Sequence, residues 1–67
     1  MTDPKQNARE AELTIDQHNY RRGYEIDGPA HALGMLLVDL LEYADENSID
    51  FGVELERARE TWKDIRS

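Results

Sequence analysis

The sequence contains no cysteine, which excludes disulfide bonds and thiolate metal sites. It also has no apolar run near the roughly 20 residues that a membrane-spanning helix needs. The first residues, Met1 to Asn7, lack the basic and then apolar order of a secretory signal. From these absences we expect a cytoplasmic protein that contacts no membrane.

The chain is short as well, and its 67 residues leave room for one domain with one small core. A folded chain of this size hides about 60% of the surface that its unfolded form exposes, and its net stability is about 3–5 kcal/mol. Association with a second copy is the remaining way to bury more apolar surface. We therefore expect a single helical domain over residues 1–67 that forms a homo-oligomer, in the simplest case a dimer.

Basic residues are missing from the whole middle of the chain. Fifteen acidic residues against eight basic ones give a net charge of −7, and no Lys or Arg occurs between Arg22 and Arg57. Nine carboxylates fall in that interval: Glu25, Asp27, Asp39, Glu42, Asp45, Glu46, Asp50, Glu54 and Glu56. Such a field repels polyanions, so we expect no direct binding to nucleic acid.

The N-terminal third favours a helix with two candidate starts. Asp3-Pro4 combines a capping side chain with a proline suited to the first helical position. The run from Thr14 to Gln17 has the form of a capping box, so the helix either continues from Asp3 or begins again there. Gly23, after two arginines, is a typical helix end. Residues 1–12 carry little apolar surface, and we expect them to be frayed or disordered.

A central helix is predicted over about 29–46, because Asp27-Gly28-Pro29 is the strongest helix start in the chain. At about 100° per residue its apolar side chains share one broad face. That face comprises Ala30, Leu33, Leu36, Leu37, Leu40, Leu41 and Ala44, while His31, Asp39, Glu42 and Glu46 fall opposite. Met35 and Val38 lie among the polar residues, so the helix is more apolar than one partner helix requires.

A last helix is predicted over about 51–66, after a stop at Asn47 in the left-handed conformation and a new cap at Asp50. One clean apolar stripe runs along it: Phe51, Leu55, Ala58, Trp62 and Ile65. The fold class is therefore all-α. We expect a helical hairpin of 29–46 and 51–66 with a shorter N-terminal helix packed across it, or against a second copy, in a small three-helix domain.

No residue pattern in the chain is typical of catalysis or of metal binding. The two histidines, His18 and His31, match no established ligand spacing, and no serine or threonine has an activating motif. The segment from Tyr20 to Tyr24 interleaves aromatic rings with two arginines, as single-strand binders do. We interpret it as a helix end with packed tyrosines, because the overall field opposes a polyanion. We expect no catalytic residues, no cofactor and no metal.

The stretch 41–50, with Glu42 and Asp45 in an E-x-x-D pattern, resembles helical segments of MazG-type nucleotide pyrophosphohydrolases. The resemblance covers about ten residues and implies a magnesium cage that hydrolyses nucleotides. That family completes its cage with an upstream E-E-x-x-E, whereas Glu10 and Glu12 stand at a different spacing. We interpret the resemblance as a shared helix-turn-helix pattern, with a fragment of such an enzyme as an alternative.

Gly34 is the one glycine that lies well away from the ends of a predicted helix. A glycine in a helix interior costs about 1 kcal/mol relative to alanine. A glycine there typically allows another helix or chain to approach closely. We therefore expect a non-enzymatic protein-interaction module or small regulator, of the kind that phages and plasmids carry, that binds a protein partner and self-associates through the central helix. The predicted contact residues are Gly34, Met35 and Val38, with Asp39, Glu42, Asp45 and Glu46 as a charged rim.

The acidic middle of the chain supports a different hypothesis. Proteins that mimic DNA present carboxylates at phosphate-like spacing, and this chain is similar to them in size and charge. The resemblance implies a protein that blocks a DNA- or RNA-binding partner. The carboxylates involved would be Asp39, Glu42, Asp45, Glu46, Asp50, Glu54 and Glu56. Binding of this kind weakens steeply with added salt, whereas apolar association changes little.

Overall fold

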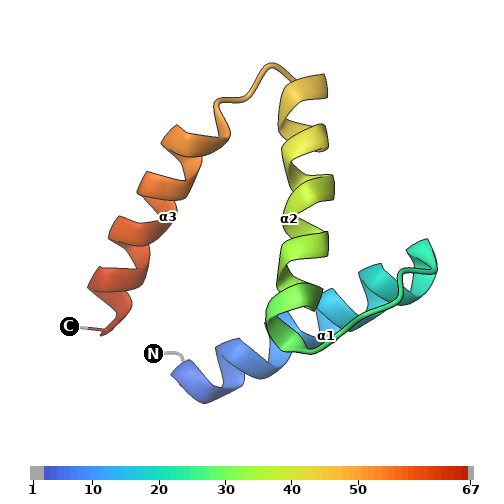
Figure 1. The fold of residues 1–67 in the computed structure, drawn as a ribbon. Coiled ribbons are helices and arrows are strands. Elements are labelled where there is room, and N and C mark those ends of the chain that lie inside the picture. The colour runs from blue at the N-terminus through green and yellow to red at the C-terminus, as the bar shows by residue number, and fades with distance from the viewer. Residues whose placement is uncertain (1–2, 67) are drawn as a thin grey trace.

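A computed structural model describes residues 3–66 and shows three helices joined by two short connections (Figure 1). They are α1 (Pro4–Arg22), α2 (Pro29–Glu46) and α3 (Phe51–Arg66), and no strand occurs between residues 3 and 66. The predicted all-α class and the predicted bounds of the last two helices are confirmed. At 19 residues α1 is the longest of the three, whereas the sequence predicted a shorter first helix.

The structure has α1 as one continuous helix that begins at the first of its two candidate starts. The side chain of Asp3 accepts a hydrogen bond from the Lys5 N–H at 3.0 Å, and Pro4 follows it. The Thr14 hydroxyl donates to the Glu10 carbonyl at 3.1 Å, so it caps nothing. Residues 4–12 form the exposed first turns of α1, and residues 1 and 2 lie outside the described part of the chain. Gly23 ends the helix with φ +69°.

The turn between α2 and α3 is fixed by hydrogen bonds. The Asn47 side chain donates to the Tyr43 carbonyl at 2.8 Å, and the Ile49 N–H donates to the Ala44 carbonyl at 2.8 Å. Asp50 accepts from the Val53 N–H at 3.1 Å, which confirms the predicted cap. The prediction of a left-handed Asn47 is wrong. Its φ is −103°, and Ser48 takes the positive φ of 56° because Asn47 already satisfies the end of α2 with its own side chain.

The three helices form an open frame rather than a closed bundle. Figure 1 shows α1 crossing α2 near one end, while α3 leaves α2 at the other end and diverges from it. The principal extents are 37 × 30 × 15 Å, and the thinnest is little more than the 10–12 Å diameter of one helix. The radius of gyration is 13.4 Å, against about 11 Å for a compact chain of this length. A single layer of helices cannot enclose a core.

The buried interior is accordingly very small. Among residues 3–66, Ala32 and Ala44 are the only buried apolar residues, Asn19 is the only buried polar one, and no large side chain is fully buried. Thirteen large apolar or aromatic side chains are more than a third exposed. The accessible surface is 5,922 Å², about 1,500 Å² above the size-scaling value for a folded monomer of this mass.

The apolar faces predicted from helical periodicity are mostly open. On α2, Leu33, Leu40 and Leu41 are 38–51% exposed, and on α3 the stripe from Leu55 to Ile65 is exposed throughout. The reason is that α1 covers a neighbouring side of α2, where Ala32 and Asp39 lie, and α3 approaches α2 only near the turn. Among the residues of the two predicted apolar faces, Leu36, Leu37 and Phe51 are half-buried and Ala44 is buried.

Over the residues that the structure describes, none of the helices combines the length and the apolar character that crossing a membrane requires.

Candidate functional site

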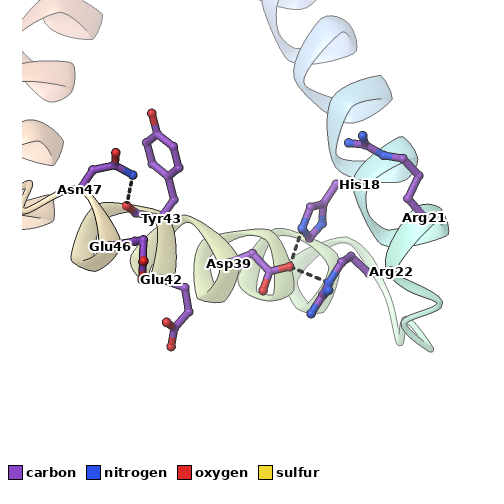
Figure 2. A pocket seen from close by; sticks show the side chains of 8 residues that line it. All are labelled: His18, Arg21, Arg22, Asp39, Glu42, Tyr43, Glu46 and Asn47. Atoms are coloured by element: carbon purple, nitrogen blue, oxygen red, sulfur yellow. Dashed lines mark hydrogen bonds and ion pairs between the residues drawn. The ribbon is translucent and has the colours of Figure 1, made fainter.

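A cluster of polar side chains joins α1 to α2. Asp39 of α2 lies at its centre, and its Oδ2 is 2.7 Å from His18 Nε2 and 3.1 Å from Arg22 Nε (Figure 2). The Tyr24 hydroxyl, which lies just beyond α1, donates to both carboxylate oxygens at 3.1 and 3.2 Å. We call His18, Asn19, Arg22, Tyr24 and Asp39 the α1–α2 clasp.

Asn19 fixes the orientation of the His18 ring. Its side-chain Nδ2 donates to the Ala32 carbonyl at 3.1 Å, which leaves its Oδ1 to face His18 Nδ1 at 2.8 Å. Both nitrogens of His18 therefore lie within hydrogen-bond distance of side-chain oxygens. In the described chain no buried side-chain nitrogen or oxygen lacks a partner.

The environment of Asp39 favours its ionised form. Burial of the carboxyl raises its pKa, but hydrogen bonds from His18 and Tyr24 and the charges of Arg22 and His18 outweigh this effect. The net result is a pKa below the ordinary 3.8. Arg22 also lies over the Tyr24 ring, 5.2 Å from its centroid. The clasp is therefore a charged, mutually satisfied junction between two helices.

The hydrogen bonds of the clasp run between its own members and the backbone of α2. A histidine held by a carboxylate occurs in nucleophilic sites, but there it activates a hydroxyl or thiol. The Thr14 and Thr61 hydroxyls instead donate to carbonyls one turn earlier in their own helices. His18 Nε2 bonds to Asp39 and joins α1 to α2, His18 Nδ1 lies against Asn19 within α1, and Asp39 also accepts from Tyr24 of the connection.

The position of Asp39 corrects the predicted polar face of α2. The sequence placed Asp39 opposite the packed side, on an open rim, whereas the structure has it half-buried against α1. Helical periodicity locates the most apolar side of α2, but α1 packs on the adjacent side, where Ala32 and Asp39 supply a small contact and a charge. The other predicted rim residues, Glu42, Asp45 and Glu46, are exposed.

An open groove of about 630 Å³ lies beside the clasp and contains part of that rim. Glu42, Tyr43, Glu46 and Asn47 line it from the C-terminal half of α2, and Arg21 lines it from α1 (Figure 2). Asp45 does not line it. The groove is wide and lined mainly by polar and charged residues, and Arg22 of α1 pairs with Asp39 of α2 at its edge.

Of the predicted contact residues, Gly34 and Val38 lie on an open side of α2, whereas Met35 is one turn after the buried Ala32. A Cβ added to Gly34 would meet no atom within 4 Å, so nothing in this single chain explains the glycine. Val38, one turn further on, is 50% exposed, and Met35 is half-buried. Their role as partner contacts stays a prediction.

A second groove, which sequence reasoning missed, lies between α1 and the start of α2. Its volume is about 580 Å³, and its walls are mostly apolar. It is lined by Ala8, Ala11, Glu12, Ile15, Asp16, Ile26, Gly28, Pro29, Ala32 and Leu33. The 3-and-4 spacing of Ala8, Ala11 and Ile15 is a signal that could have revealed it. We call it the α1 groove.

Metal binding has no geometric support in residues 3–66, where no three His, Cys, Asp or Glu side chains are grouped to hold an ion. His31 accepts a hydrogen bond from the Asp27 N–H at 3.0 Å, and His18 belongs to the clasp. The carboxylates of the mimic hypothesis are partly compensated as well. Asp39 pairs with Arg22, and Glu54 pairs with Arg57 at 2.9 Å.

Comparison of the chain with protein-family models, with curated proteins and with solved structures found no match.

Proposed function

We propose that this chain is a non-enzymatic protein-interaction module that self-associates, with a second copy of itself as its first partner. The observation that carries the proposal is the missing core. Two buried alanines are the whole apolar interior of residues 3–66, while leucines of α2 and the stripe of α3 stay in contact with water.

The exposed area supports an assembly of dimer size. Stable interfaces bury about 800 Å² on each partner. The excess surface here is about 1,500 Å² per chain, so a dimer that covers it buries about 3,000 Å² in total. This value lies in the range of obligate dimers, whose interfaces resemble a domain core divided between two chains.

The α2 contact residues fit this role. Gly34 leaves room for the backbone of a neighbouring helix, and Val38 on the next turn adds apolar area beside it. Glu42 and Glu46 continue α2 beyond the contact and supply an acidic, solvated rim. Such a pairing of an apolar centre with a charged rim is the usual anatomy of protein interfaces.

Sedimentation velocity tests the proposal directly. We expect a species of twice the 7.8 kDa chain mass at micromolar concentration, and a return toward the single-chain mass on dilution. A single 7.8 kDa species at all concentrations would show that the chain does not self-associate.

A further inference from the structure

The C-terminal half of α3 carries an exposed apolar patch. Trp62 and Ile65 are 54% and 46% exposed, and no residue of α3 is buried. The Arg66 guanidinium lies over the Trp62 ring, 4.9 Å from its centroid. The helix end thus combines one large aromatic side chain, one aliphatic side chain and a cation in a single patch.

The α1 groove has the complementary character. Ala8, Ala11 and Ile15 form one apolar wall from α1, and Leu33 lies on the α2 side. Glu12 and Asp16 also line the groove, one helical turn apart. Neither carboxylate makes an ion pair within residues 3–66. An apolar trough with two such carboxylates suits an apolar helix end that carries cations.

We propose that the C-terminal half of α3 from one copy occupies the α1 groove of a second copy, with Trp62 as the anchor. Ile65 extends the apolar contact. Arg66, and Lys63 on release from its 3.7 Å pair with Glu60, bring positive charge to Glu12 and Asp16. The inference rests on the self-association proposed above and adds a second contact to the α2 contact named there. An aromatic anchor beside an arginine is the typical composition of an interface hot spot.

We take a second copy as the occupant because the α1 groove and the α3 patch are both open in a single chain and the excess surface per chain is of dimer size. The turn after α2 is closed by bonds from Asn47 to Tyr43 and from Ile49 to Ala44, and Asp50 caps the start of α3. These bonds set the direction in which α3 leaves α2, and Figure 1 shows the two helices diverging. The C-terminal end of α3 points back toward the start of α1 in Figure 1, so closure of α3 onto the groove of its own chain is the alternative that the mixing experiment below separates.

Two-fold symmetry makes the exchange self-consistent. Each copy donates one helix end and receives one, so a single type of contact occurs twice in a closed dimer. In such a dimer the partner covers both the α1 groove and the α3 stripe of each copy. This accounts for an excess area per chain that is about twice the area of a standard contact patch.

A charge-exchange experiment tests the contact in the full-length chain. The groove variant carries Glu12→Lys and Asp16→Lys, and the helix variant carries Lys63→Glu and Arg66→Glu. Each variant alone should self-associate at least about tenfold more weakly than the wild type, because both of its contacts join like charges. An equimolar mixture should form a mixed dimer within about threefold of the wild-type affinity, since every contact in it again joins opposite charges.

Circular dichroism of each variant establishes that it is helical before its association is measured. Failure of the mixture to recover, with helical variants and a dimeric wild type, would overturn the swapped contact and leave self-association standing. A monomeric wild type would overturn both proposals. If α3 instead closed onto its own chain, each variant would lose stability in a concentration-independent manner, and mixing would restore nothing.

Trp62 supplies an independent readout because it is the single tryptophan of the chain. Its emission should shift to shorter wavelength as the wild type is concentrated and the ring leaves water. Trp62→Ala should weaken sedimentation-detected association by about tenfold or more. Leu13→Ala, which truncates a 56% exposed residue outside the α1 groove, should leave it unchanged. A wild type that dimerises with unchanged Trp62 emission would contradict the proposed contact.

Discussion

His18 of α1 and Asp39 of α2 lie 2.7 Å apart, and this pair joins two helices that are otherwise connected by little apolar contact. Tyr24 and Arg22 bond to the same carboxylate, and Asn19 holds the other side of the imidazole. The crossing of α1 and α2 is thus specified by polar geometry, while the apolar faces of α2 and α3 stay available for a second copy.

Asn19 should be the most sensitive polar position of the clasp, because it is buried and makes two side-chain contacts. Asn19→Ala leaves the Ala32 carbonyl and one nitrogen of His18 without these partners. We expect it to lower the free energy of unfolding by about 1–3 kcal/mol at fixed protein concentration. Asn7→Ala, on the exposed first part of α1, is the matched control and should change it by less than about 0.5 kcal/mol. Equal effects of the two substitutions in urea unfolding would argue against the clasp.

Tyr24 tests the contribution of a single hydroxyl. Tyr24→Phe keeps the ring beneath Arg22 and removes the donor to Asp39, so we expect a loss of about 0.5–1.5 kcal/mol in thermal or urea unfolding. Tyr20→Phe removes the same group from a ring that is 87% exposed and should have almost no effect. A neutral Tyr24→Phe would show that its hydroxyl does not hold the junction.

Asp39 makes the stability of the junction dependent on acid. Its pKa is lower in the folded chain than in the unfolded chain, so its contribution is present above about pH 4, the unfolded value. The contribution is lost as the pH falls through the folded pKa. Asp39→Asn should therefore be less stable than the wild type at pH 7, and the difference should shrink below about pH 4. Unfolding curves of both proteins across this range measure it, and a difference that is constant with pH would be inconsistent with the described environment of Asp39.

Gly34 separates helix stability from association. A side chain at this position meets open space in the single chain, so Gly34→Leu should strengthen α2 by about 0.5–1 kcal/mol. The same side chain should weaken self-association by about tenfold if a partner helix lies against Gly34. Gln17→Leu adds leucine at another exposed helical position and controls for the added apolar surface. Sedimentation of Gly34→Leu with wild-type affinity would remove Gly34 from the contact surface.

The bounds of α2 and α3 and the end of α1 could be predicted from the sequence because their causes are local. Pro29 after a glycine, Asp50 before an apolar stripe and Gly23 after two arginines each act on the backbone within one turn. In the second connection the left-handed residue is Ser48 and not the predicted Asn47. The reason is that the Asn47 side chain already bonds to the Tyr43 carbonyl at the end of α2.

The packing could not be predicted in the same way. Periodicity shows which side of a helix is apolar, but it does not show which element covers that side. Asn19 and Asp39 have the character of surface residues until His18, Tyr24 and the Ala32 carbonyl are brought next to them by the crossing of the helices. The open position of α3 could not be predicted from its apolar stripe either. The same stripe could pack against a helix of its own chain or of another chain.

The central claim is that a second copy completes the core, and the dependence of thermal unfolding on protein concentration tests it most directly. If folding is coupled to dimer formation, the midpoint measured by circular dichroism should rise steadily as the concentration is raised from about 1 to about 100 μM. A midpoint that is the same throughout this range, with full helicity at the lowest concentration, would show that the single chain is stable without a partner and would contradict the claim.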